Sequence, residues 1–275
     1  MSWFTFHHEA MATDFSITIA GQEQDYARQA AVAAWRELDR LETELSRFIQ
    51  SSDIARASRI AEGETIAIGD DAMQCLLLAV EVAVATQRAF DPAYASERSH
   101  EGAPFTLDPS AHTLTSHAKR LHLDLGAIGK GYSLDRLADT LRDWGVNQAC
   151  LQSGGSTALA LAAPTEDPAG WPLGLGEDES YRALPLANAA LSASGIAVKG
   201  AHLVNPLTRM AAARTARVWA LAASAALSDA LSTAFFVMTD DEIAGFCRAH
   251  PEIGAAIAAD DTLSLHGTLA PANLS

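Results

Sequence analysis

The sequence has few cysteines, few cationic residues and no long uninterrupted apolar run. Its three cysteines, Cys75, Cys150 and Cys247, are far apart and form no CxxC pair, which predicts reduced thiols rather than a disulfide framework or a zinc site. The first residues lack the basic and apolar stretches of a secretory signal. The longest apolar stretch, 218–238, contains Ser and Asp at its centre and is too polar to span a membrane. These absences predict a cytoplasmic protein without a membrane segment.

Positive charge is also scarce. The chain has 19 Lys and Arg residues against 34 Asp and Glu residues, and its formal net charge is −15. Because such a surface repels phosphate, nucleic acid and anionic membranes are not expected partners. An anionic ligand would need backbone amides, a few local cations or a metal ion.

The composition is that of an ordinary globular protein. Hydrophobic residues make up 49% and charged residues 19% of 275 residues, which excludes a disordered chain and leaves ample length for a core. No linker composition divides the sequence. We therefore expect a single domain over 1–275, which could consist of two closely packed lobes.

Hydrophobic periodicity predicts both helices and strands. Helices are expected over 23–47, 71–88, 131–144, 224–238 and 240–250. Strands are expected at 13–19, within 104–125, at 148–162 with an interruption at Gly154–Gly155, and at 189–193, 202–204 and 216–222, with a hairpin around 260–261. Loops and a hairpin are expected over 163–185. Since no regular βαβ rhythm appears, the order favours an α+β fold with mixed sheets and packed helices.

A glycine-rich turn at 123–139, LDLGAIGKGYSLDRLAD, precedes the 131–144 helix. It fits neither the P-loop nor the GxGxxG spacing. Amides at a helix N-terminus attract phosphate oxygens, carbonyls in such a turn can bind a cation, and Lys130 could lie beside a phosphate. The alternative is a turn whose glycines serve only its backbone conformation.

Asp229 and Thr233 are four residues apart on an expected helix and therefore share one face. A carboxylate and a hydroxyl so placed could bind Mg²⁺, which prefers oxygen ligands. The alternative is a carboxylate that only interacts with the helix dipole. His202, before an Asn-Pro turn, could act as a general base, although single histidines are often structural. Asp91 in AFDP and the Gly154–Gly155 pair could contact a ligand, or could be an ordinary turn and a β-bulge.

Taken in order, these segments resemble motifs of the ApbE family of FAD:protein FMN transferases, from Met11 to about Met238. MATDFSITI is similar to its Met-Gly-Thr opening, LSRFIQSSDIARAS to its aromatic and Ser-Glu-Ile/Leu-Ser-Arg segment, and AFDP to its Phe-Asp-Pro. DLGAIGKGYSLDRLAD resembles its most specific signature, Asp-Leu-Gly-x-Ile-x-Lys-Gly-Tyr-x-x-Asp. SGGST, SASG, HLVNPLTR and SAALSDALSTAFFVM resemble four further motifs in the family's order.

The resemblance implies an ApbE-like, T-fold-related α+β architecture and a Mg²⁺-dependent transferase. Such an enzyme moves the FMN half of FAD onto a Ser or Thr hydroxyl in the flavinylation motif of an acceptor flavoprotein and releases AMP. By position, the residues that would contact FAD are Met11, Phe48, Ala89, Phe90, Asp91, Asp124, Lys130 and Leu203. The Mg²⁺ ligands would be Asp229, Thr233 and the carbonyl of Ala127. His202, Lys130 and Asp229 would be the catalytic residues, with His202 as the base.

The chain departs from the family's pattern at Ala12, Ser156, Ala193, Asn205 and Arg209. Two alternatives to transfer therefore stay open at this point. One is a relative that hydrolyses FAD to FMN and AMP or only binds flavin, and the other is a globular protein without a flavin function. The sequence names neither the acceptor nor the oligomeric state. It does make one geometric prediction, that the 126–131 turn and the 229–233 segment converge.

Overall fold

The computed structural model describes residues 2–98, 101–164, 170–176, 181–195, 206, 217–259 and 262–270. Helices and strands are mixed along these ranges, and every sheet pairing between them is antiparallel. This arrangement is the expected α+β class. No helix within the described ranges has the length and apolar character needed to cross a bilayer.

The largest sheet has eight strands in the order β1-β2-β8-β9-β12-β13-β14-β15. These strands are β1 (Trp3–Ala10), β2 (Thr13–Ala20), β8 (Ala149–Ser153), β9 (Thr157–Ala160), β12 (Ala189–Ser194), β13 (Arg217–Ala222), β14 (Gly254–Ala259) and β15 (Thr262–Gly267). Alternate residues of β2, namely Phe15, Ile17 and Ile19, are fully buried, as expected for a strand with one face in the core.

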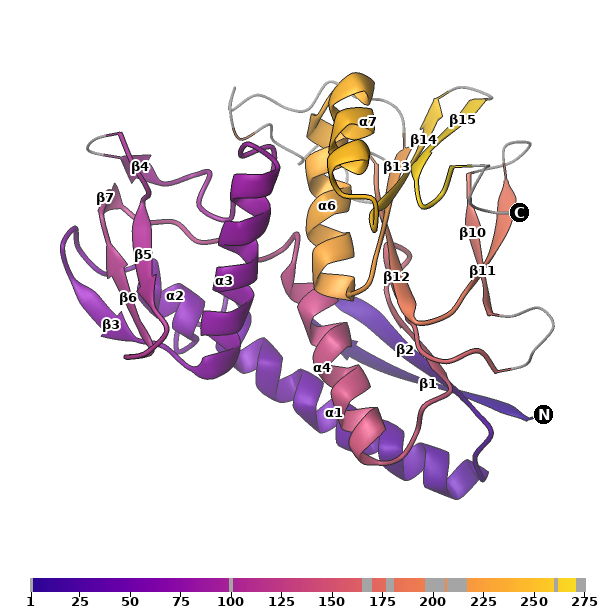
Figure 1. Cartoon of the computed structure of the whole chain (residues 1–275). Coiled ribbons are helices and arrows are strands. Elements are labelled where there is room, and N and C mark those ends of the chain that lie inside the picture. The colour runs from indigo at the N-terminus through magenta and orange to yellow at the C-terminus, as the bar shows by residue number, and fades with distance from the viewer. Residues whose placement is uncertain are drawn as a thin grey trace.

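Four helices cover that face of the sheet. They are α1 (Gln24–Leu45), α4 (Gly129–Asp143), α6 (Ala225–Val237) and α7 (Asp240–Ala249). The long α1 contacts β1 and α4, α4 contacts α6, and α6 packs on β12 and β13 (Figure 1). The crossing of α4 and α6 is the contact that positions the site described below.

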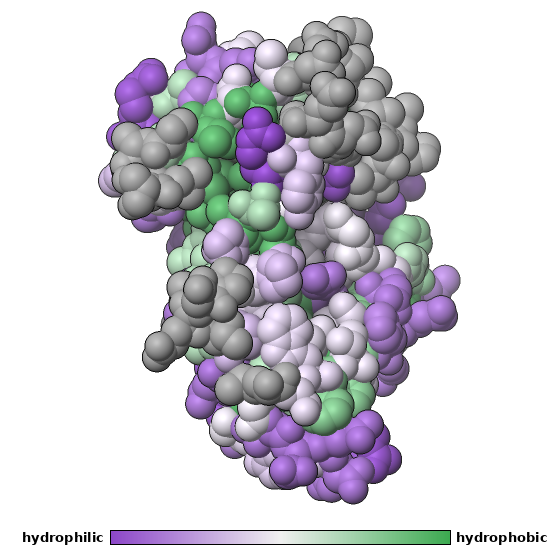
Figure 2. Space-filling view, turned by 90° about the vertical axis from the view of Figure 1, so that its right-hand side faces the viewer, coloured by the Kyte–Doolittle hydropathy of each residue, from purple (hydrophilic) through white to green (hydrophobic). Residues whose placement is uncertain are grey.

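The other face of the sheet is covered by a hairpin of β10 (Trp171–Leu175) and β11 (Arg182–Leu186). Trp171 of this hairpin is buried in a second hydrophobic cluster that also contains Cys150 and Trp219. Figure 2 views the molecule from this side, where hydrophobic side chains lie among hydrophilic ones.

A smaller group of elements, which includes α3, lies beside the large sheet, and α3 is the element of this group that faces it (Figure 1). It contains a sheet ordered β3-β6-β5, a β4-β7 pair and two helices. Its elements are β3 (Thr65–Ala67), β4 (Glu97–Arg98), β5 (Phe105–Asp108), β6 (Thr113–Ser116), β7 (Ala118–Arg120), α2 (Asp53–Ala57) and α3 (Asp70–Ala85). Leu76 and Leu114 here belong to the same buried cluster as Ile17 of the large sheet. That the chain forms one domain over 1–275 stays a prediction.

Most expected elements are present, but helix α2 and strands β3 and β4 were not expected, and there are further differences. The expected helices appear as α1, α3, α4, α6 and α7, and the hairpin expected in 163–185 is β10–β11. Strand β1 was not expected, because its two adjacent histidines weaken its apolar alternation. The expected interrupted strand at 148–162 is instead two antiparallel strands, β8 and β9, joined by a turn at 154–156. The expected strand 202–204 and the hairpin tip 260–261 lie outside the described residues.

Candidate functional site

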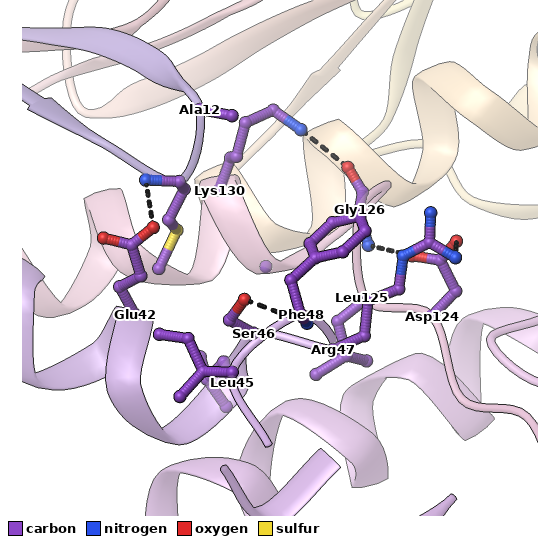
Figure 3. Close-up of a pocket in the computed structure, with 13 residues that line it drawn as sticks. Ala12, Glu42, Leu45, Ser46, Arg47, Phe48, Asp124, Leu125, Gly126 and Lys130 are labelled. Carbon is purple, nitrogen blue, oxygen red and sulfur yellow. Dashed lines mark hydrogen bonds and ion pairs between the residues drawn. The ribbon is translucent and has the colours of Figure 1, made fainter. Parts of the chain in front are cut away.

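A cavity of about 550 Å³ lies where α1 ends and α4 begins. The C-terminal end of α1 contributes Glu42 and Leu45, and the loop after it contributes residues 46–49. The β1–β2 turn adds Met11 and Ala12, and the glycine-rich turn adds residues 124–126, Gly129 and Lys130 (Figure 3). Four residues predicted to contact FAD, Met11, Phe48, Asp124 and Lys130, therefore line one cavity.

The glycine-rich turn and helix α6 meet beside this cavity. The backbone N–H of Gly131 donates a hydrogen bond to Asp229 Oδ2 at 3.3 Å, and Lys130 Nζ lies 3.8 Å from the same oxygen. Lys130 Nζ also donates to the carbonyl of Gly126 at 2.6 Å (Figure 3). The predicted convergence of segments 126–131 and 229–233 is thus confirmed by the fold.

The residues around Asp229 fit a hard cation. Asp229 is completely buried, and Thr233 follows it by one helical turn. The Thr233 Oγ1 atom is buried and has no hydrogen-bond partner among the described residues, so it is available to a ligand. One carboxylate, one hydroxyl and a carbonyl such as that of Ala127 are oxygen donors of the kind that Mg²⁺ takes together with phosphate and water. The described residues contain no cluster of three or more His, Cys, Asp or Glu that could hold a metal by themselves.

The β1–β2 turn places two non-glycine residues in the left-handed region. Met11 has φ 51° and Ala12 has φ 58°. The N–H of Met11 donates to Glu42 Oε1 at 2.8 Å, and the hydroxyl of Ser133 donates to Met11 Sδ at 3.5 Å. These contacts join the turn to α1 and α4. The positive φ of Ala12 also gives a physical reason for the glycine that the family motif has at this position, since glycine adopts a positive φ without steric cost.

We expect Ala12→Gly to stabilise the protein by about 1 kcal/mol, because it removes the steric cost of a Cβ at positive φ. For a chain of this length, that change corresponds to a rise in Tm of about 2 °C. Thermal unfolding monitored by circular dichroism measures it. An unchanged or lowered Tm would show that the turn carries no such strain.

Phe48 is the most exposed large hydrophobic side chain in the described part of the protein, at 80%. The guanidinium of Arg47 lies 4.6 Å from its ring centroid and 3.3 Å from Asp124 Oδ2 (Figure 3). A hydrophobic ring at the mouth of a cavity offers a stacking surface for a planar ligand. Arg47 adds a cation close to Lys130 in a protein with few cations.

Three other predicted FAD contacts do not line this cavity. Ala89 and Phe90 are buried, and the side chain of Asp91 is only 7% exposed. The carboxylate of Asp91 accepts hydrogen bonds from Arg88 and Arg98. The residue after Asp91 is bonded to the cavity wall, because the carbonyl of Pro92 accepts a 2.8 Å hydrogen bond from the N–H of Asp124. Direct contact of these three residues with FAD stays a prediction.

Two of the predicted residues, His202 and Leu203, lie outside the described residues, as do the departures Asn205 and Arg209. The departures Ser156 and Ala193 are described, and the N–H of Ala193 donates to the carbonyl of Ser156 at 2.7 Å.

The sequence interpretation missed several residues at the site. Arg47, Glu42 and Ser46 line the cavity, and Asp135 contacts the start of α6. Arg47 could have been found by its position next to Phe48. Glu42 could have been found because it precedes the buried Leu45 by three residues on α1 and therefore lies near it on the helix surface.

The model of the ApbE family matches residues 11–257. The fold is similar to the flavin transferase ApbE from Vibrio cholerae, at 17% identity and a TM-score of 0.80 over 96% of both chains. It is also similar to the apo form of the flavinyl transferase ApbE of Pseudomonas stutzeri, at 16% identity and a TM-score of 0.80 over 96% of this chain and 94% of that one. The ApbE protein of Thermotoga maritima matches at 20% identity and a TM-score of 0.79, over 97% and 98%. These likenesses confirm the ApbE-like α+β fold. No curated protein matches the chain.

Proposed function

The chain belongs to the ApbE family, and on that premise we propose that it is a transferase that moves the FMN half of FAD onto a Ser or Thr hydroxyl of an acceptor flavoprotein. The observation that carries the proposal is the convergence of Lys130 and Asp229 beside the cavity. Lys130 is a cation at the N-terminus of α4, and Asp229 is a buried carboxylate beside it. Such groups can bind a metal-bound pyrophosphate.

In the proposed reaction the acceptor hydroxyl oxygen attacks the phosphorus of the FMN half. A new oxygen–phosphorus bond forms, and the bond from that phosphorus to the bridging oxygen breaks. AMP leaves with the bridging oxygen, and the hydroxyl proton passes to a base of the enzyme. The two sides of the reaction therefore balance without an oxidant or a further co-reactant.

The residues of the chain have distinct roles in this proposal. Asp229, Thr233 and the carbonyl of Ala127 would hold Mg²⁺, which would offset charge on the phosphates when it is bound. Lys130 supplies a fixed positive charge 3.8 Å from the carboxylate of Asp229. Arg47 and Phe48 form the cavity wall against which a ring of FAD would stack.

The experiment that tests the function uses the full chain with FAD, Mg²⁺ and a flavoprotein that carries a Ser/Thr acceptor segment. We expect the acceptor to gain the mass of FMN, with one AMP released for each FMN attached. Release of AMP and free FMN without that gain would instead identify an FAD hydrolase. No turnover and no bound flavin would reject a flavin function.

Replacing Phe48 by alanine is expected to weaken FAD binding about two- to tenfold, because the loss of an aromatic stack costs roughly 0.5–1.5 kcal/mol. The free energy of unfolding should stay within about 0.5 kcal/mol of the wild-type value, since the ring is exposed. A titration of flavin fluorescence measures the affinity. Val84→Ala removes an exposed hydrophobic side chain from α3, outside the cavity, and should leave FAD binding unchanged. Equal affinity of Phe48→Ala and the wild type would exclude Phe48 from the binding site.

For His202, proposed as the base that takes the acceptor proton, we expect His202→Ala to slow FMN transfer by about 10²-fold while FAD binding is retained. The rate of covalent FMN incorporation and the FAD affinity are measured on the same preparation. His250→Ala, at the end of α7, serves as the histidine control. Full transfer by His202→Ala would remove this residue from the mechanism.

A further inference from the structure

Helices α4 and α6 cross with their backbones in direct contact at Gly131. A Cβ atom on Gly131 would lie 2.2 Å from the carbonyl oxygen of Ala225 and 2.8 Å from the nitrogen of Ala226. No side chain fits at that distance. The start of α6 is therefore held directly on the first turn of α4.

Asp135 lies one turn further along α4, on the same face as Gly131. One of its carboxylate oxygens accepts a hydrogen bond from the N–H of Ala225 at 2.8 Å, and the other accepts from the N–H of Ala226 at 2.9 Å. The first amides of a helix have no partner within the helix and are usually capped by a nearby residue of the same chain segment. Here the local cap, Ser224, accepts only from Leu227, and a residue of another helix caps the first two amides.

A second contact in the opposite direction joins the same two helices. The N–H of Gly131 on α4 donates to Asp229 Oδ2 on α6, one turn after Ala225. Each helix thus binds backbone amides of the other through one carboxylate. Because the two carboxylates lie one turn along their helices from the crossing point, sliding α6 by one residue, about 1.5 Å, would break both sets of hydrogen bonds.

We propose that Asp135 is a positioning residue, which caps α6 from α4 and thereby sets the position of Asp229 and Thr233 relative to the glycine-rich turn, on which the affinity for Mg²⁺ depends. This inference rests on the proposed function. Asp135 does not line the cavity, and its two carboxylate oxygens accept hydrogen bonds from the backbone of Ala225 and Ala226. Its effect is transmitted through the position of the helix that carries Asp229 and Thr233.

The burial of Asp135 agrees with a specific role. Burial raises the pKa of Asp135 to about 6, although the hydrogen bonds from Ala226 and Ala225 act in the opposite direction. A buried carboxylate is therefore kept at a helix start that already has a serine cap. The serine reaches only the N–H of Leu227, so an apolar residue in place of Asp135 would leave the N–H groups of Ala225 and Ala226 without this acceptor.

The test compares Asp135→Asn and Asp135→Ala with Thr239→Ala, which removes the cap of α7, a helix without predicted site residues. In Asp135→Asn, the amide group can still accept one hydrogen bond but turns an N–H toward the other backbone N–H. Mg²⁺ affinity is measured by calorimetry on the full chain loaded with FAD, and folding by circular dichroism. We expect both Asp135 variants to bind Mg²⁺ about 10–100-fold more weakly, as is typical when a residue that orients a metal ligand is lost. Thr239→Ala should bind it as the wild type does.

A second measurement on the same proteins does not depend on Mg²⁺ or FAD. Hydrogen exchange of the segment that contains Gly131 should be faster in Asp135→Asn than in the wild type, and unchanged in Thr239→Ala. Folded Asp135 variants with wild-type Mg²⁺ affinity and wild-type exchange of this segment would overturn the inference. Failure of the wild type itself to bind Mg²⁺ would reject the proposed function, and the exchange measurement would then decide the positioning of α6 independently.

Discussion

Replacing Asp229 by alanine is expected to lower Mg²⁺-dependent turnover about 10³-fold. The side chain is completely buried and lies on the face of α6 that meets the glycine-rich turn. A metal ion that stabilises charge in a phosphoryl-transfer reaction contributes several kcal/mol, and about 4 kcal/mol corresponds to this factor. The rate of AMP release over a range of Mg²⁺ concentrations is the measurement.

Thr233→Val tests the same site with almost no change in shape. We expect it to raise the Mg²⁺ concentration needed for half-maximal turnover, because the methyl group that replaces the hydroxyl cannot be a ligand. Thr140→Val on α4 is the matched control, since its hydroxyl donates only to the carbonyl of Arg136 one turn earlier. Unchanged Mg²⁺ dependence in both Asp229→Ala and Thr233→Val would show that the ion, if it binds, does so elsewhere.

Replacing Asp71 by alanine is expected to lower the free energy of unfolding by about 2 kcal/mol, in the range for hydrogen bonds to a charged group, because the two arginines that pair with it are 40% exposed. Asp71 lies in the first turn of α3, is buried, and connects three helices. It accepts hydrogen bonds from Arg40 of α1 at 2.6 Å and from the hydroxyl of Tyr132 of α4 at 2.7 Å, and Arg136 lies 3.2 Å away. Its loss would leave the buried hydroxyl of Tyr132 without this acceptor and two arginines without a shared anion.

The stabilisation by Asp71 should depend on pH in a defined direction. Burial acts to raise the pKa of Asp71, but hydrogen bonds from Arg40 and Tyr132 outweigh it, and the pKa in the folded protein lies below the ordinary value of 3.8. A carboxylate with a lowered pKa stabilises the fold fully above its ordinary pKa and loses that effect as the pH falls through the folded value. The difference between wild type and Asp71→Ala should therefore be constant above about pH 5 and shrink below pH 4.

Denaturant unfolding at several pH values measures both expectations. Asp70→Ala, the neighbouring and exposed residue in the first turn of α3, is the control, with an expected change within about 0.5 kcal/mol. Equal effects of the two substitutions would show that the three-helix network contributes nothing specific.

Features that depend on local periodicity could be predicted from the sequence. The helix predicted over 131–144 is α4 at Gly129–Asp143, and the predicted C-terminal Gly145 has φ 69°, the left-handed conformation that ends many helices. The order of the short motifs also placed Lys130 and Asp229 in one site. Both inferences use residue types at fixed spacing, which the sequence displays directly.

Features that depend on packing between distant segments could not be predicted in this way. Asp135 and Ala225 are 90 residues apart, and no local pattern in either segment indicates that Asp135 caps the helix that begins at Ala225. The hydrogen bond from the N–H of Asp124 to the carbonyl of Pro92 likewise joins segments about 30 residues apart. The ion pair of Arg47 with Asp124 also joins two segments that are far apart in the sequence.

The pairing of β2 with β8 and the late position of α6 affect how the protein is made. Strand β2 can pair with β8 only after about 130 further residues have been synthesised, and the helix with Asp229 emerges from the ribosome about 100 residues after the glycine-rich turn. A nascent chain therefore has the glycine-rich turn long before it has the carboxylate opposite. The proposed Mg²⁺ site therefore cannot be complete before α6 has been synthesised, and contacts of such large sequence separation make slow folding the expected regime.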